Sequence, residues 1–138
     1  MRTAGTRPIA DRERRRGAAL VELAVCLPTL IFVMLMAMES ADVIFLKQTL
    51  HIAAYEAARA AIEPGSTKSV AEAAAEHILD DRRVQDYNVQ FTPGNVSGVS
   101  PGEMITVTVS APVKKNTALP SWYLGKSQLQ AQVKMNKE

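Results

Sequence analysis

The chain has 138 residues, and 16 Lys and Arg against 14 Asp and Glu leave a formal net charge of +2. This length accommodates one small domain and one membrane-spanning helix, but no second large core. The single cysteine, Cys26, excludes an internal disulfide framework. The small basic excess does not indicate a nucleic-acid-binding protein, because no basic nucleic-acid-binding domain follows the N-terminal arginines.

Residues 1–17 form a basic N-terminal segment. This segment contains six arginines and only two acids, Asp11 and Glu13, so its net charge is +4. The remaining residues have a slightly negative net charge. Positive charge beside one end of a membrane span keeps that end in the cytoplasm. We therefore expect residues 1–17 to be a cytoplasmic leader.

An apolar run follows the leader. From Ala18 to Met38 the only charged residue is Glu22. As a helix, this run would rise about 31 Å, which matches a hydrocarbon core of about 30 Å. The run is apolar on every side, unlike the one-sided stripe of a soluble helix. We predict a transmembrane helix at residues 18–41, with Pro28 either kinking it or weakening it for exit from the bilayer.

Two other interpretations of the apolar run remain open. The four residues ending at Cys26 faintly resemble a lipoprotein cleavage site, although Val25 fits poorly and the preceding stretch contains Glu22. A secretory signal peptide could instead be cut near Ser40 and Ala41, although the residues before them make a poor cleavage site. Both interpretations are disfavoured. The fold prediction therefore assumes that the apolar run stays attached to the domain as a membrane span.

The helix is predicted to continue beyond the membrane. Glu39 and Asp42 mark its emergence into water, and Pro64-Gly65 ends it. A stripe of mostly small residues recurs at helical spacing, which suits close packing on another surface: Leu46, Leu50, Ala53, Ala54, Ala57 and Ala61. The sequence thus predicts one helix of about 45 residues, with its first half in lipid and its second half on a domain.

A second, shorter helix should follow. Ser66 or Ser69 can cap it, and Glu72 lies three residues after Ser69, as in a capping box. The predicted buried face consists of Val70, Ala73, Ala74, His77 and Ile78. Residues 80–83 are predicted to be its solvated end.

Three segments alternate apolar and polar residues, at residues 87–92, 105–110 and 129–135. This two-residue period predicts strands of a sheet that is exposed to solvent on one face and covered by helices on the other. Residues 93–102 are rich in Pro and Gly and are predicted to join the first two strands as a hairpin loop. We predict an α+β fold in which the long N-terminal helix packs on a three-stranded antiparallel sheet with a second short helix, within a domain at residues 42–138.

The loop at residues 112–127 is long, which is typical of a functional or irregular segment. It contains Trp122, Tyr123 and Leu124, the first of which is the only tryptophan. These residues could cover an open end of the small core, contact a partner protein, or touch the bilayer. The sequence leaves the three interpretations open.

No arrangement of side chains indicates catalysis or metal binding. His51 and His77 lie on different predicted helices, and Glu72 and Glu76 resemble an ordinary solvated pair. No Gly-rich loop between a strand and a helix offers a phosphate cradle. We expect no enzyme activity, no cofactor, no metal and no small-molecule substrate.

The boundary between leader and span carries a recognisable pattern. A basic leader, Gly17, four apolar residues and Glu22 together resemble the processing site of type IV prepilins. With further residues in the same order, the chain resembles the TadE-like family, the minor pseudopilins of the bacterial tight-adherence (Tad) pilus machine. The residues are Arg15-Arg16-Gly17-Ala18-Ala19-Leu20-Val21-Glu22-Leu23-Ala24, Leu27-Pro28, Glu39, Lys47-Gln48-Thr49-Leu50 and Ala53-Ala54-Tyr55-Glu56-Ala57-Ala58-Arg59-Ala60-Ala61.

The resemblance implies cleavage between Gly17 and Ala18 by a prepilin-type peptidase. It implies that Glu22 serves subunit association and that the domain is a reduced pilin-like head. It also implies a single-pass protein of the bacterial inner membrane, with a cytoplasmic N-terminus and an extracytoplasmic C-terminal domain. The implied partners are that peptidase, other pseudopilins or pilin, inner-membrane pilus assembly proteins and membrane lipid, and no nucleic acid.

Two other functions remain possible from the residues alone. One is an uncleaved membrane anchor that displays an extracytoplasmic sensor or adaptor domain, and the other is a released secreted protein. Glu22 argues against a plain anchor, which has no use for an acid at that depth.

Overall fold

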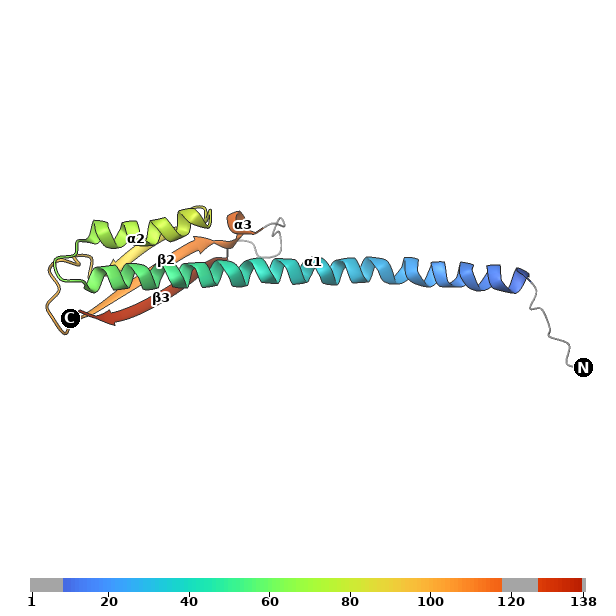
Figure 1. Ribbon diagram of the computed structural model, residues 1–138, viewed down its shortest axis with the longest axis horizontal. Coiled ribbons are helices and arrows are strands. Elements are labelled where there is room, and N and C mark those ends of the chain that lie inside the picture. Colours follow the sequence, from blue (N-terminus) through green and yellow to red (C-terminus); the bar gives the residue numbers. More distant parts are fainter. Residues whose placement is uncertain (1–8, 118–126, 138) are drawn as a thin grey trace, which may run out of the picture. The chain divides into compact units, whose positions relative to one another are not determined.

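The computed structural model describes residues 9–117 and 127–137, and the chain divides into two compact units, Met1–Met38 and Glu39–Glu138. The elements are labelled in Figure 1. They are α1 (Ile9–Ile62), α2 (Lys68–Asp81), β1 (Asn88–Thr92), β2 (Met104–Pro112), α3 (Val113–Asn116) and β3 (Gln128–Asn136). Helix α1 contributes residues to both units, and all the other elements belong to the second.

The second unit contains a three-stranded antiparallel sheet in the order β1-β2-β3. The central strand β2 alternates as the sequence predicts, with Ile105, Val107 and Val109 fully buried and the residues between them partly exposed. Phe91 of β1 and Ala131 of β3 are buried on the same face. The α+β fold predicted from the sequence is therefore confirmed.

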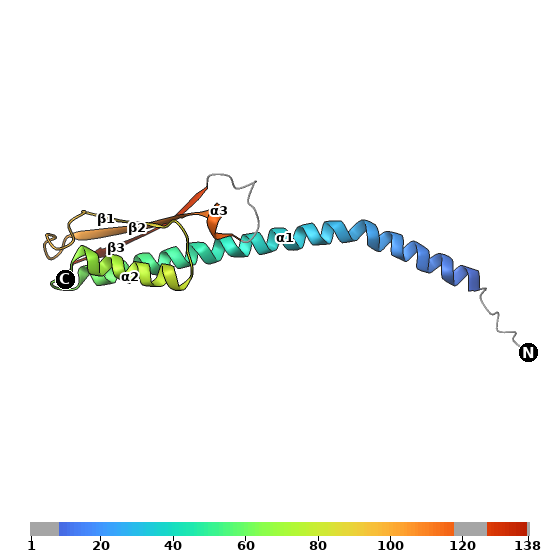
Figure 2. The same cartoon turned by 90° about the horizontal axis from the view of Figure 1, so that it is seen from above.

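The C-terminal part of α1 and α2 form a helical layer on one face of this sheet, as the two views agree (Figures 1 and 2). The small-residue stripe of α1 is buried in that layer, as predicted. Its members are Leu46 (5% exposed) and Leu50, Ala53, Ala54, Ala57 and Ala61, which are each fully buried. Most members of the stripe are alanines, so α1 contributes mainly methyl groups to the core at this face.

Ala57 is a sensitive position in this contact. It is fully buried, so leucine there would force additional carbon atoms between α1 and the sheet. Overpacking of this kind costs about 1–3 kcal/mol. We expect Ala57→Leu to lower the midpoint of thermal unfolding of the full-length protein, measured by circular dichroism in detergent. Gln48→Leu, at an exposed position of the same helix, should leave the midpoint nearly unchanged; equal midpoints for the two variants would contradict the packing argument.

Helix α2 corrects two sequence predictions. Its N-cap is Thr67, and no side chain caps its first turn; the Thr67 hydroxyl instead shares a hydrogen bond of 2.9 Å with Ser69. The buried face consists of Ala71, Ala75 and Leu79. Of the predicted face, Val70, Ala73 and His77 are exposed, and Ala74 and Ile78 are partly buried. Alanines occur on several sides of this helix, so their pattern could not fix which side faces α1 and the sheet.

The end of α2 is a left-handed turn at a residue other than glycine. Arg83 has φ of 54°, its N–H donates to the carbonyl of Asp80, and the N–H of Val84 donates to the carbonyl of Leu79. This is the hydrogen-bond pattern of a Schellman motif, which is usually completed by glycine. Leu79 and Val84 are both buried, so the turn is held by an apolar contact as well as by hydrogen bonds.

The connections add core residues that the sequence pattern did not identify. In the loop between β1 and β2, Val96 and Val99 are buried, and the Lys137 ammonium donates to the carbonyl of Val96 at 3.0 Å. The predicted loop at residues 112–127 begins with the short helix α3. Of the rest of that loop, residues 118–126, including Trp122, Tyr123 and Leu124, lie outside the described residues.

In the first unit, α1 begins at Ile9, well before the predicted start of the span. Its total length is 54 residues rather than about 45, because the second half of the leader is also helical. Pro28 lies inside the helix without ending it. The part of α1 beyond Arg16 is long and apolar enough to span a membrane, and the large apolar side chains between Leu20 and Met38 are exposed.

Candidate functional site

The three residues at the proposed processing site lie on the exposed surface of α1. Gly17, Ala18 and Glu22 all belong to the first unit, and Ala18 and Glu22 are separated by one helical turn. A Cβ added at Gly17 would meet no atom within 4 Å. Nothing in the described fold therefore requires glycine at this position.

Glu22 is a lone acid on an apolar helix. It is exposed, and no hydrogen bond or ion pair joins it to the described part of the chain. The neighbouring exposed side chains, such as Val21 and Leu23, are apolar. A carboxylate in such surroundings is costly in lipid and is most often retained for a functional contact.

Glu39 is a candidate residue whose environment differs from the sequence prediction. The sequence places it at the emergence of the helix into water, but both of its carboxylate oxygens are buried and accept no hydrogen bond within the described residues. A buried carboxylate without a partner is strongly unfavourable unless a cation joins it. Glu39 is therefore a candidate contact for a basic group, and no periodicity in the sequence signalled its burial.

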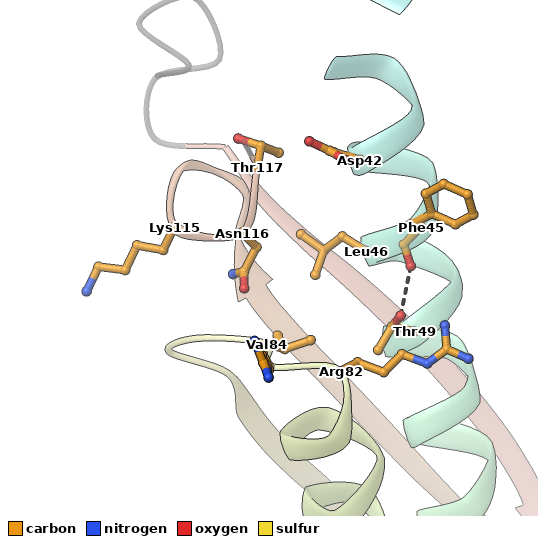
Figure 3. A pocket seen from close by; sticks show the side chains of 10 residues that line it. Asp42, Phe45, Leu46, Thr49, Arg82, Val84, Lys115, Asn116 and Thr117 are labelled. Carbon is orange, nitrogen blue, oxygen red and sulfur yellow. Dashed lines mark hydrogen bonds between the residues drawn. The ribbon is translucent and has the colours of Figure 1, made fainter. Parts of the chain in front are cut away.

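An open groove with a volume of about 370 Å³ lies in the second unit (Figure 3). Residues 42–49 of α1 line one side of the groove, residues 82–84 line another, and residues 115–117 of α3 and its end complete it. The Arg82 side chain extends towards α1, near Thr49 (Figure 3). Phe45 is 61% exposed at the side of the groove.

Most polar groups around the groove bond to one another. The Asn116 side chain accepts from the N–H of Gln85 at 2.7 Å and donates to the carbonyls of Gln85 and Pro112. The Lys115 ammonium pairs with Asp86, and the Thr49 hydroxyl donates to the carbonyl of Phe45 at 2.9 Å. These contacts fix the shape of the groove and tie α3 to the segment that follows α2.

Arg82 and Arg83 are the exceptions, because neither guanidinium has a hydrogen bond or ion pair with any described residue. Both follow the C-terminal end of α2, where a positive charge interacts favourably with the helix dipole. Guanidinium groups also bind carboxylates and phosphates through paired hydrogen bonds. Sequence analysis assigned these arginines only to a solvated helix end, and both are indeed exposed.

The described residues offer no arrangement suited to metal chemistry: no cluster of three or more potential ligands from His, Cys, Asp or Glu occurs among them. Outside the span, partial burial and then the neighbouring Asp80 raise the pKa of Tyr87, whose hydroxyl donates to that carboxylate at 3.1 Å. Both causes disfavour the negatively charged phenolate. His77 lies beside Asp81 on the exposed side of α2.

The predicted interface role of three residues in the loop at 112–127 stays a prediction. Trp122, Tyr123 and Leu124 fall outside the described residues. The described residues of the same loop, 113–117, form α3 and one side of the groove.

Comparison with known proteins identifies the N-terminal part of the chain. The family model described as TadE-like protein matches residues 17–59, beginning at the glycine of the proposed processing site. No curated protein and no solved structure matches the chain. TadE-like proteins are generally non-enzymatic structural proteins. Residues 17–59, which lie within the long helix α1 and include its apolar part, therefore match a TadE-like family domain.

Proposed function

We propose that this protein is a single-pass, pseudopilin-like subunit of a Tad-type pilus assembly or secretion machine. It acts by associating with other subunits, not as an enzyme, after a prepilin-type peptidase has removed residues 1–17. The observation that carries this proposal is the family match from residue 17 onwards, which coincides with an exposed Gly17 and a single acid, Glu22, on an apolar helix.

The proposed cleavage would create a new pair of charges. Ala18 would gain a free amine one helical turn before Glu22. In a membrane, an amine of one subunit and the carboxylate of its neighbour attract strongly, although loss of hydration cancels part of the gain. The value of such a pair lies in fixing neighbouring helices at the same depth.

The arginines of the leader support one orientation in the membrane. Their positive charge favours a cytoplasmic N-terminus, which leaves the second unit outside the inner membrane. The partners of this proposal are the peptidase, other pseudopilins or pilin, inner-membrane assembly proteins and membrane lipid. Glu22 and Glu39 offer carboxylates to such partners, and Arg82 and Arg83 offer guanidinium groups.

One observation favours a second candidate function, an uncleaved membrane anchor for an extracytoplasmic sensor or adaptor domain. Helix α1 runs from Ile9 through Gly17 without a break, so the fold itself does not mark residue 17 as a boundary. In this alternative the leader would remain attached.

N-terminal sequencing of the protein extracted from membranes separates the two functions. In a host that contains the peptidase, we expect Ala18 as the first residue, because cleavage follows Gly17. The same protein from a host without the peptidase should begin at Met1 and serves as the control. Retention of Met1 in both hosts would contradict the pseudopilin proposal and support the anchor.

A further inference from the structure

The outer strands β1 and β3 each have one side without a neighbouring strand among the described residues. β3 is nine residues long, pairs with β2 in an unbroken register, and contains no proline and only one charge, Lys134. Natural proteins usually protect such edges with short strands, prolines, bulges or several charges. β1 is short, at five residues, but β3 has almost none of these protections.

The hydrogen bonds show which backbone groups remain free on these edges. The N–H of Lys137 donates to the carbonyl of Glu103, and the N–H of Val113 donates to the carbonyl of Ser127. The odd-numbered residues of β3 therefore bond towards β2. Antiparallel strands alternate the direction of their backbone groups. The N–H and C=O groups of Gln130, Gln132 and Lys134 therefore point outwards from β3.

The same reasoning applies to β1. The even-numbered residues of β2 face β1, so Gln90 bonds towards Thr108, and the backbone groups of Val89 and Phe91 point outwards. Each outer strand thus presents, at alternate residues, N–H and C=O groups without a strand partner among the described residues.

Apolar side chains at these margins are incompletely covered. On the helix side of the sheet, Leu129, Val133 and Met135 of β3 and Val89 of β1 are only partly buried. The corresponding residues of β2, such as Val107 and Val109, are fully buried. Another strand beside either margin would bury apolar surface as well as satisfy backbone groups.

We infer that β3 of one copy pairs in parallel with β1 of the neighbouring copy, so that one sheet continues through adjacent subunits. The inference rests on the proposed single N-terminal anchor, which makes α1 of every copy leave the membrane in the same direction. β1 and β3 both run antiparallel to β2, and they run in the same direction as the C-terminal part of α1 (Figure 1). Copies standing side by side therefore bring these two edges together as parallel strands.

The two edges also match in register. Gln90 and Gln132 both lie opposite Thr108, so they occupy the same level of the sheet. With neighbouring copies at equal height, Val89 N–H would donate to the carbonyl of Gln130, and Gln132 N–H would donate to the carbonyl of Val89. This is the slanted pattern of parallel strands. The core-facing side chains of both strands then share one face, and no like charges meet.

A symmetric alternative conflicts with the membrane anchor. Pairing β3 with β3 of a second copy would make the two strands antiparallel, as a two-fold axis requires. The second copy would then be inverted relative to the first, although both must leave the same membrane. Pairing of β3 with β1 instead is head-to-tail, so it extends into a ring or a filament.

Disulfide cross-linking tests the inference in the full-length protein in its own membranes. In a Cys26→Ala background, Gln90→Cys and Gln132→Cys are combined in one chain. Within a chain these positions are two strand spacings apart, about 9–10 Å, too far for a disulfide. Oxidation should therefore give a ladder of multimers on a non-reducing gel. Mixing the two single-cysteine chains should give only dimers that contain one of each.

Two variants serve as controls. Thr108→Cys places a thiol on the same face and level but on the central strand, and it should give no multimers. Gln132→Pro removes an outward N–H and keeps the bonds to β2. Cysteines at residues 88 and 130, which both lie opposite Ser110, should give a ladder that Gln132→Pro abolishes without changing the unfolding midpoint. Repeating the scan with cysteines at residues 130 and 134 detects a stagger of two residues.

Absence of a ladder at every tested register, or dimers formed by the Gln132→Cys chain alone, would overturn the inference. Cross-linking of residue 132 to a different protein would overturn it as well, because the occupant would not be a second copy. Cleavage after Gly17 is measured on the same samples. Normal cleavage with no ladder would remove the sheet pairing and leave the proposed function standing.

Discussion

Replacing Gly17 by aspartate is expected to leave nearly all of the protein uncut, with residues 1–17 still attached. The proposed peptidase must accept the residue before the cut, and glycine has no side chain to exclude. An aspartate adds bulk and a negative charge beside the basic leader. Because a Cβ at this position meets no atom within 4 Å, the substitution leaves the described fold intact. Intact-mass measurement of the membrane-extracted protein gives the ratio of the two forms.

Gly94→Asp is the matched control for this substitution. It adds the same side chain at another glycine whose Cβ would meet no atom within 4 Å, but in the loop after β1. This variant should be cut as completely as the wild type. If the Gly17→Asp protein also began at Ala18, the processing site would have to lie elsewhere or be recognised by other residues.

Replacing Glu22 by leucine is expected to abolish recruitment of pilus subunits while leaving membrane insertion and cleavage intact. A charge at the centre of a span costs about 2.5–3.5 kcal/mol on insertion scales, and leucine removes whatever part of that cost applies at this depth. The variant also removes the carboxylate that would pair with a neighbouring amine. Glu22→Gln should have a milder defect, because an amide accepts a hydrogen bond but carries no charge.

Cross-linking from a cysteine at Ala19, in a Cys26→Ala background, measures the contact between neighbouring spans. The Glu22→Leu protein should lose most of the cross-linked product and should not support pilus formation. Thr29→Leu makes another polar-to-apolar change on the exposed part of α1. This control variant should retain both the cross-linked product and pilus formation. Unchanged cross-linking and normal piliation in the Glu22→Leu protein would contradict the proposed role of this carboxylate and favour the plain anchor.

Strong periodic patterns made much of the fold predictable. The stripe from Leu46 to Ala61 and the alternation around Val107 each specify one buried face, and the structure buries both. Such patterns work because a helix or strand repeats its direction at a fixed interval. The position of α2 was harder, since Ala73, Ala74 and Ala75 offer similar methyl groups on different sides of the helix. Only packing against α1 and the sheet selects Ala75.

The candidate site was less predictable because it depends on residues far apart in the chain. Arg82 and Thr49 line the same groove, and Asn116 bonds to Gln85. Neither relationship follows from local spacing. The burial of the Glu39 carboxylate likewise arises from tertiary structure. From the sequence, an acid that follows an apolar run predicts the point where the helix enters water. The roles of Gly17 and Glu22 stay a prediction, which the sequence allows because their pattern is contiguous.

The alanine-rich buried face of α1 in the second unit has a mechanical consequence. Alanine methyl groups project little from the helix surface, so the contact is smooth over most of its length. Leu46 and Leu50 are the two large side chains of the stripe, and both lie towards the end nearer the apolar run. A force directed along α1 would load this contact in shear, and these two leucines would supply most of the resistance to sliding. A pull along this part of α1 would therefore reach the rest of the second unit mainly through Leu46 and Leu50.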